Sequence, residues 1–413
     1  MNSKQRIQEV LKHRIPDRVP IDFGATPGTS ISPIAYDKLR KKLGIDGDLI
    51  KIPNFLSQAV YPEQKILDMY NVDIIDAGRS FLKSIKWKNY RLNDGNEYLI
   101  PDFIKIEIDI NGNECLLNED GFIVSKKRKD SFYFEECSWP FKNLKEIPVS
   151  IDDKVLKMIY WSIPFIPWHL DIFDSKQFEV FVNSIKELSE KTDKAISLMV
   201  LCDIFESAKS LRGTENFLCD IYQDKKGTER LLDVLLEKNL EKLKRLLDGV
   251  GRYVDILRFV DDLGFQNGPF IPPEKYREIF KPRYKKMWDF VHNNSKCAVS
   301  LHSCGSIFEL LPDLIEAGVE VINPVQTSAR DMEPEKLKKE FGKYIIFWGG
   351  CGDTQNILPF GNTKDVEKDT KERIKILGEN GGLIFAHINT IQPDVPPENV
   401  ISMLQTANEY GKY

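Results

Sequence analysis

The sequence predicts a single α/β domain over 1–413, folded as a (β/α)8 TIM barrel with one β-rich insertion. The chain contains short apolar runs with the composition of β-strands, and helical patterns lie between most of them. Strands that alternate with helices in this way form a parallel sheet. Eight such repeats match the number of strands in a TIM barrel. The runs are 19–23, 72–76, 195–200, 254–260, 297–303, 319–325, 344–348 and 383–387. A six-stranded doubly wound sheet is the alternative, but no Gly-x-Gly-x-x-Gly follows a strand and no P-loop is present.

The helices expected between the runs follow from their apolar periodicity. Segment 228–247 repeats leucine at helical spacing, at Leu231, Leu232, Leu235, Leu236, Leu240, Leu243 and Leu246. The pattern over 273–292 is also helical, although Pro282 should kink or break it. The other expected helices are 1–13, 35–43, 306–317, 334–341, 365–377 and 397–410.

The insertion is expected at 86–141, where the texture of the chain changes. Turn signals recur at Asn93-Asp94-Gly95-Asn96, Asn111-Gly112-Asn113 and Glu119-Asp120-Gly121. Isoleucine alternates with charged residues over 104–110, which is typical of a strand with one exposed face. An aromatic cluster at 132–134 and 139–141 follows. It is either the local core of a β-meander or part of a lid over a site.

Composition excludes several classes of protein. The formal net charge is -5 and no basic block stands out, so we expect no nucleic-acid partner. No apolar run approaches the ~18 residues of a membrane span. The first six residues lack the apolar core of a signal peptide. The 7 cysteines are scattered along the chain. These features predict a cytoplasmic protein with reduced thiols and no membrane association.

Polar side chains gather where the later runs end. In a TIM barrel the active site lies at the C-terminal ends of the strands. The ends of the fourth to eighth runs carry Asp261 and Asp262, His302 and Cys304, Asn323 and Gln326, Cys351 and Asp353, and His387 and Asn389. We expect Asp261 and Asp262 to position substrate or accept a proton. A turn-forming role before Gly264 is the alternative for both.

His302 and Cys304 are the strongest candidates for metal ligands. Residues two apart on a strand project to the same side, so the imidazole and the thiolate would point together at the strand end. This is half of a zinc site, and an open catalytic site usually takes three protein ligands. His387 and Cys351 are both candidates for the third ligand, although Cys351 also fits a tight turn. Gln326 is either an oxygen ligand or an amide contact to substrate.

Four motifs together resemble the uroporphyrinogen decarboxylase superfamily, and in particular its corrinoid-dependent methyltransferase-like branch. They are Asp261-Asp262-Leu263-Gly264-Phe265-Gln266, His302-Ser303-Cys304-Gly305, the segment 349–355, and Gln392-Pro393-Asp394-Val395-Pro396-Pro397-Glu398-Asn399. Pro16-Asp17-Arg18-Val19-Pro20 is a further N-terminal mark. The resemblance covers most of the chain except the insertion, and it implies a TIM barrel.

The departures from the family pattern bear on the reaction. True uroporphyrinogen decarboxylases carry an arginine-rich segment after the first strand, which binds the carboxylates of the substrate. Segment 22–28 has no arginine here, which argues against that decarboxylation. The methyltransferase branch implies zinc held by His-x-Cys and a late cysteine. That cysteine is absent, and His387 and Asn389 stand near its place. We therefore expect His302, Cys304 and His387 to bind zinc, with Asn389 and Cys351 as alternatives to His387.

The resemblance implies a methyltransferase, specifically a demethylating component that uses zinc as a Lewis acid. It would move a methyl group between a small organic donor, such as a methoxy compound, and a corrinoid. No Asp-x-His-x-x-Gly cobalamin motif is present, so the corrinoid should arrive on a separate protein. Asp261, Asp262 and Gln326 are the expected catalytic residues. A uroporphyrinogen decarboxylase-like decarboxylase and a non-enzymatic binding protein are the competing hypotheses.

Overall fold

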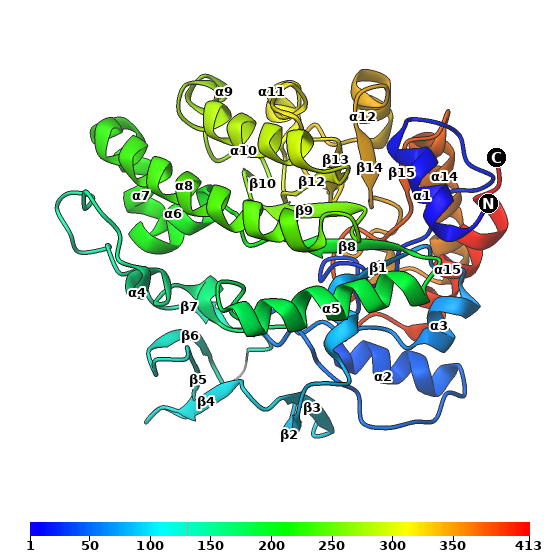
Figure 1. Ribbon diagram of the computed structural model, residues 1–413. Coiled ribbons are helices and arrows are strands. Elements are labelled where there is room, and N and C mark those ends of the chain that lie inside the picture. Colours follow the sequence, from blue (N-terminus) through cyan, green and yellow to red (C-terminus); the bar gives the residue numbers. More distant parts are fainter. Residues whose placement is uncertain (130) are drawn as a thin grey trace.

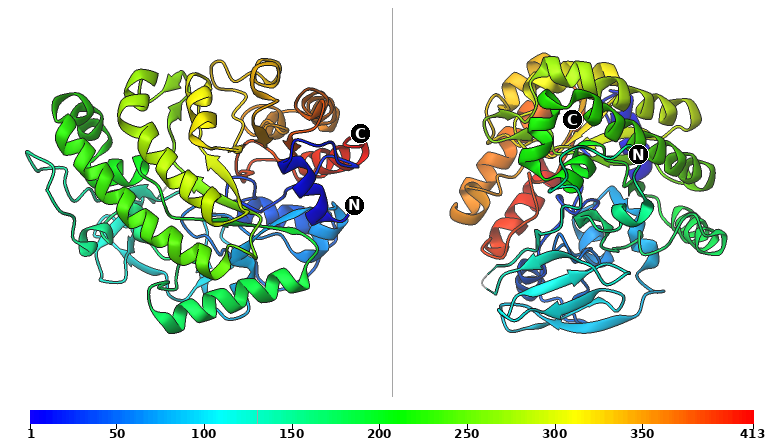
Figure 2. Two further views of the ribbon diagram at one scale, coloured as in Figure 1. Left: turned by 45° about the horizontal axis from the view of Figure 1, so that its top comes forward. Right: turned by 90° about the vertical axis from the view of Figure 1, so that its left-hand side faces the viewer.

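A curled parallel sheet forms the centre of the molecule. The computed structural model describes residues 1–129 and 131–413. The sheet has seven strands in the order β1-β8-β9-β12-β13-β14-β15. They are β1 (Ile74–Asp76), β8 (Ala195–Met199), β9 (Ile256–Val260), β12 (Ala298–His302), β13 (Val321–Asn323), β14 (Ile346–Trp348) and β15 (Leu383–Ile384). Helices surround the sheet (Figure 1, Figure 2), which confirms the expected α/β TIM-barrel fold.

The gap between β15 and β1 is closed by a short extended segment around Ile21. This residue forms parallel bridges to both Val72 and Phe385. The backbone N–H of Phe385 donates to Pro20 at 2.8 Å, and the N–H of Asp73 donates to Ile21 at 2.7 Å. The run 19–23 therefore occupies the expected place of the first strand, but only as isolated bridges. Pro20 has no N–H to donate, which limits the ladder that this segment can form.

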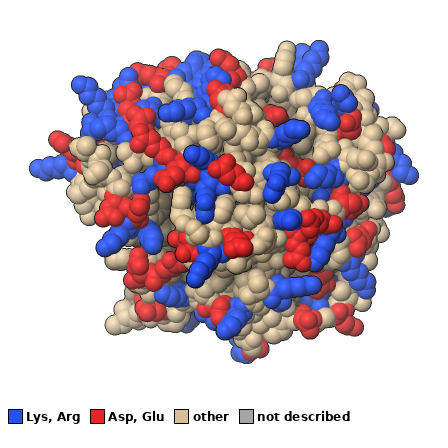
Figure 3. Space-filling model, viewed as in Figure 1, with Lys and Arg blue, Asp and Glu red and all other residues tan. Residues whose placement is uncertain are grey.

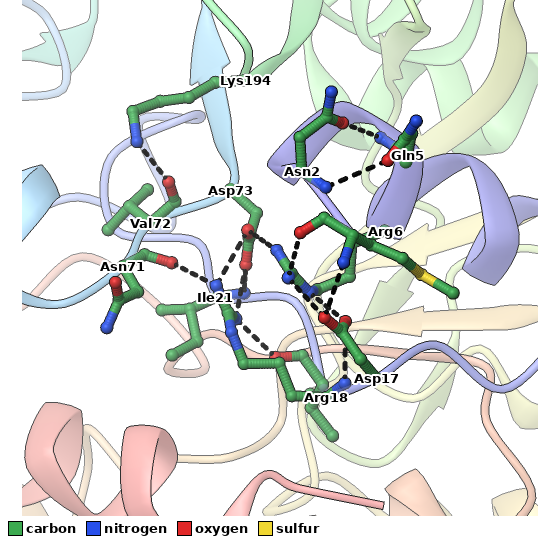
Figure 4. A network of polar contacts seen from close by, with 12 residues as sticks. Asn2, Gln5, Arg6, Asp17, Arg18, Ile21, Asn71, Val72, Asp73 and Lys194 are labelled. Carbon is green, nitrogen blue, oxygen red and sulfur yellow. Dashed lines mark hydrogen bonds and ion pairs between the residues drawn. The ribbon is translucent and has the colours of Figure 1, made fainter.

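The closing segment is fixed by a buried network of charges (Figure 4). The Asp73 carboxylate is fully buried and accepts from Arg6 Nη1 at 2.6 Å, Arg18 Nη1 at 2.7 Å and the Ile21 N–H at 2.8 Å. Asp17 accepts from Arg6 Nε at 2.7 Å. Arg6 lies on α1 (Ser3–Leu11), so the network joins this helix to the point where the barrel closes.

Apolar helix faces cover the outside of the barrel. In α8 (Lys225–Val250) the predicted leucines are buried except Leu240, which is partly buried. The helix expected over 273–292 is interrupted just before Pro282. It begins with the short α9 (Pro273–Lys275) and a π-helical segment, Tyr276–Phe280. Pro282 then lies in the first turn of α10 (Lys281–Asn294). The remaining helices are α2 (Pro33–Lys42), α3 (Gln64–Met69), α4 (Asp153–Leu156), α5 (Ser175–Lys191), α6 (Phe205–Arg212), α7 (Thr214–Gln223), α11 (Leu311–Ala317), α12 (Pro334–Phe341), α13 (Ile357–Phe360), α14 (Thr363–Gly378) and α15 (Pro397–Tyr410).

The segment between β1 and α5 carries two small antiparallel sheets, which lie below α5 in Figure 1. One pairs β2 (Trp87–Arg91) with β3 (Glu97–Pro101). The other contains β4 (Lys105–Ile108), β5 (Glu114–Leu117), β6 (Ile123–Lys127) and β7 (Glu135–Glu136). Gly95, Gly112 and Gly121 have φ of 79°, 80° and 83°, which explains the glycine in each turn.

The surface carries both signs of charge. Figure 3 shows lysine and arginine interspersed with aspartate and glutamate over the face in view. Among the described residues, no helix combines the length and the apolar character that a membrane span needs.

Candidate metal centre and barrel cavity

A cavity of about 450 Å³ opens at the C-terminal ends of the strands. Its walls combine apolar side chains with amides and hydroxyls. The lining residues are Thr26, Pro27, Gly28, Asn54, Leu56, Ser57, Tyr133, Phe165, Met199, Arg258, Val260, His302, Gln326, Thr354, Gln355, Ile388, Asn389, Thr390 and Gln392. The expected site residues His302 and Gln326 therefore face one cavity, as a small-molecule site requires.

Three side chains at this end of the barrel form a group with metal-ligand chemistry. One ligand atom each of Asp262, His302 and Cys304 lies within 4.8 Å of the other two. Nε2 of His302 is 3.6 Å from Sγ of Cys304. Nitrogen, thiolate and carboxylate are the ligand types of zinc, and three protein ligands leave a position open. The donor set therefore fits the zinc that the sequence suggested, with Asp262 as the third member.

The strand order explains how these side chains meet. His302 is the last residue of β12, and Asp262 follows the neighbouring β9. The backbone N–H of Cys304 donates to Oδ1 of Asp262 at 2.8 Å, which holds the carboxylate next to the thiol. Burial first, and then the negative charge of Asp262, raise the pKa of the Cys304 thiol well above its ordinary value. A divalent cation at this position would reverse that effect, because metal ligation favours the thiolate.

The tautomer of His302 is set by its neighbour on β13. Nδ2 of Asn323 donates to the backbone oxygen of Trp348 at 3.0 Å. The amide oxygen of Asn323 is therefore the atom that faces Nδ1 of His302, at 2.9 Å, and Nδ1 must carry the proton. Nε2 then presents a lone pair towards Cys304. This is the arrangement that orients a metal-binding histidine through its second nitrogen.

The loop after β12 packs closely against the hairpin after β9. Gly305 has φ +82°, and a Cβ atom there would lie 2.5 Å from the carbonyl carbon of Gly264. Only glycine fits such an approach of two backbones. The Gly305 N–H donates to Oε1 of Gln326 at 2.8 Å. Gln326 thus supports the loop that carries Cys304, while it also lines the cavity.

Asp261, expected to be catalytic, lies outside the lining of the cavity. Its carboxylate accepts from the N–H groups of Ile204 at 2.9 Å and Glu206 at 2.7 Å, and from the Tyr284 hydroxyl at 2.7 Å. These bonds hold the start of α6 and part of α10 against the end of β9. Burial, and then the charge of Asp203, raise the pKa of Asp261 above its ordinary value. These hydrogen bonds give Asp261 a supporting position. The adjacent Asp262 does not line the cavity either, but its carboxylate belongs to the metal-ligand group.

His387, the expected third ligand, is not brought into the group. It is fully buried, and its Nε2 lies 2.9 Å from the backbone oxygen of Ser30. Its ring packs edge-on against Phe23. Cys351 is also fully buried, and burial raises its pKa to about 12. Asn389 does line the cavity, but its Oδ1 accepts the Thr390 N–H at 2.7 Å.

The aromatic cluster of the insertion divides between the two expected roles. Phe134 and Phe141 are buried, as in a local core. Tyr133 instead lines the barrel cavity, and its hydroxyl donates to Oε1 of Gln392 at 2.8 Å. A residue from the insertion thus contacts the loop that follows the last strand, at the wall of the cavity.

The chain is similar to a family model and to solved structures. The family model described as uroporphyrinogen decarboxylase (URO-D) matches residues 169–410. A solved methyltransferase from Methanosarcina mazei is 15% identical, with a TM-score of 0.58 and 99% of each chain covered. A B12-independent methionine synthase from Shewanella sp. W3-18-1 is 12% identical, with a TM-score of 0.43, covering 94% of this chain and 97% of the other. No curated protein matches the sequence.

Proposed function

Because the chain belongs to the uroporphyrinogen decarboxylase (URO-D) family, we propose that it is an enzyme that moves a methyl group between a small organic molecule and a separate corrinoid protein. The observation that carries the proposal is the group of Asp262, His302 and Cys304, of which His302 lines the cavity at the C-terminal ends of the strands. The resemblance of the His302-Ser303-Cys304-Gly305 motif to the methyltransferase branch, stated above, supplies the reaction. Zinc in this site would act as a Lewis acid on the heteroatom that carries the methyl group.

The residues of this chain would bind and orient the donor. Asn323 accepts a hydrogen bond from Nδ1 of His302. The lone pair of Nε2 is therefore left for the metal. Gln326 also lines the cavity, and its Nε2 lies 3.2 Å from Gln266 Oε1. Together with Asp262, it is the residue that we expect to touch the reacting part of the donor. Asp261 would position α6 instead of acting on substrate.

The insertion would exclude water from the reaction. Tyr133 of the insertion lines the cavity, and its hydroxyl donates to Gln392 on the loop that follows the last strand. A cover over the site would protect a reactive reduced carrier and strengthen polar interactions with the donor. The corrinoid would enter on its partner protein, because the chain has no cobalamin motif of its own.

The test is a transfer assay with defined components. Zinc-loaded protein is mixed with a reduced corrinoid protein and a panel of methoxy aromatics, methylamines and methylthiols. Methylation of the corrinoid, followed by its visible absorption, is the expected result, and it should be lost in Cys304→Ser. Lys244→Ala, a change on the outer helix α8, is the matched control.

Decarboxylation is the competing reaction, since the matching family model bears that description. The assay therefore also measures carbon dioxide release from a porphyrinogen. The segment 22–28 supplies no arginine, and a porphyrinogen with many carboxylates needs several cations. Carbon dioxide release with no methyl transfer would replace the methyltransferase proposal.

A further inference from the structure

Arg258 is a buried cation at the floor of the cavity. It lies in the middle of β9, is 4% exposed, and lines both the main cavity and a small pocket of about 20 Å³ next to it. It is the one Lys, Arg, Asp or Glu among the described residues that line the main cavity. A charge in such a place needs partners, because burial without them is costly.

Asp76, the ion-pair partner of Arg258, does not engage all of the N–H donors of the guanidinium. Nη2 forms an ion pair with Oδ2 of Asp76, at the end of β1. The other oxygen of Asp76 accepts from the Tyr61 hydroxyl and the Gly78 N–H, each at 2.7 Å. Asp76 is therefore stabilised by two donors besides the arginine. Nε of Arg258 is buried and has no hydrogen-bond partner among the described residues.

The strand register places this arginine below the metal-ligand group. Val260, two residues after Arg258, is in register with His302 on β12. Two residues along a strand span about 7 Å, so the two positions lie at different depths of the same cavity. The same cavity wall carries the apolar side chains of Leu56, Phe165, Met199 and Ile388. This spacing suits a molecule with an apolar middle and two different polar ends.

We propose that Arg258 is the subsite for a carboxylate of the substrate, whose opposite end lies at Asp262, His302 and Cys304. Asp76 engages only Nη2 of the guanidinium, and arginine forms strong charge-assisted hydrogen bonds to a carboxylate. A phosphate dianion fits less well, because the lining offers a single permanent cation and otherwise neutral amides and hydroxyls. The inference rests on the proposed function for one point only, namely that the end near His302 carries the methyl group.

The experiment compares two probes of one shape and different charge. Binding of 4-methoxybenzoate and 4-methoxybenzamide to the zinc-loaded protein is measured by titration calorimetry, without any corrinoid protein. We expect the benzoate to bind roughly tenfold or more tightly than the amide, as for a hydrogen bond to a charged group. The double variant Arg258→Met/Asp76→Asn removes both charges together, so that no unpaired carboxylate stays buried, and it should abolish the preference.

The controls separate the subsite from fold and net charge. Arg252→Met removes an exposed arginine before the start of β9 and should keep the preference. Arg258→Lys retains the charge and should keep part of it. Equal affinity for the two probes, no binding of either, or a preference that persists in a folded double variant would each overturn the proposal. An Arg258-dependent preference with no methyl transfer to any corrinoid would leave the subsite standing and reject the proposed function.

Discussion

Nδ1 of His302 and Oδ1 of Asn323 lie 2.9 Å apart, on neighbouring strands and in direct register. The partner of the Asn323 amide nitrogen is a backbone oxygen, so the direction of this hydrogen bond is fixed. Asn323 is not itself an expected metal ligand, but it orients His302, which is one. Replacing Asn323 therefore tests the orientation of His302 without removing a ligand.

Replacement of Asn323 by leucine should weaken zinc binding by about 10–100-fold, the usual cost of losing a partner behind a metal-binding histidine. Asn323→Asp keeps an acceptor for Nδ1 and should retain most of the affinity. Zinc affinity is measured by competition with a coloured chelator. A leucine variant that binds zinc as tightly as the native protein would show that the histidine needs no such support.

The ligand set can be tested by metal content. Asp262→Asn, His302→Ala and Cys304→Ser should each lose most of the zinc, because their ligand atoms are grouped within 4.8 Å. His387→Gln and Cys351→Ser should keep it, since both residues are buried apart from that group. Metal analysis of the five purified variants gives the answer. The opposite pattern, with loss in His387→Gln and retention in Asp262→Asn, would restore the ligand expected from the sequence.

The closure of the barrel should depend on Asp73. Asp73→Ala removes the acceptor of Arg6, Arg18 and the Ile21 N–H, and should destabilise the protein by about 3–5 kcal/mol, as when one partner of a buried pair is lost. Glu187→Ala breaks an exposed pair with Lys191 and should cost less than about 1 kcal/mol. Urea unfolding of the two variants measures the difference. Equal costs would mean that the buried network does not hold the barrel closed.

Regular patterns in the sequence predicted the barrel well. Apolar runs and helical spacing are local properties, and they located the seven strands of the sheet and the interruption at Pro282. The run 19–23 was expected to form a full strand, yet only Ile21 bridges its neighbours. Pairing of that segment depends on the distant Asp73 and Phe385, which local spacing does not reveal.

The site was predicted only in part, for the same reason. His302 and Cys304 share a strand end, so their period of two placed them together. The roles of Asp262 and His387 depend on how loops fold back after the strands. Arg258 lies inside an apolar run and pairs with Asp76, 182 positions away, so nothing local marked it as part of a cavity. Its only local signal was a charge in the middle of a strand expected to be buried.

His387 gives a prediction on the pH dependence of stability. Burial lowers its pKa to about 4, so the folded protein keeps it neutral where the unfolded chain, with an ordinary value of 6.5, takes up a proton. Between these values the unfolded state binds more protons, and stability falls as the pH falls. The contribution is fully present above pH 6.5 and amounts to roughly 3 kcal/mol when it is lost near pH 4, at 1.36 kcal/mol per pKa unit.

Other buried groups act in the opposite direction, so the comparison must be made between variants. Burial raises the pKa of Asp22 to about 7 and that of Glu206 to about 8, which makes the folded state relatively more stable as the pH falls towards their unfolded values. These groups are the same in His387→Gln, whose amide can still donate to Ser30. Free energies of unfolding in urea, measured from pH 7 to pH 4, should therefore fall less in the variant than in the native protein. Parallel curves would show that His387 takes up its proton equally in both states.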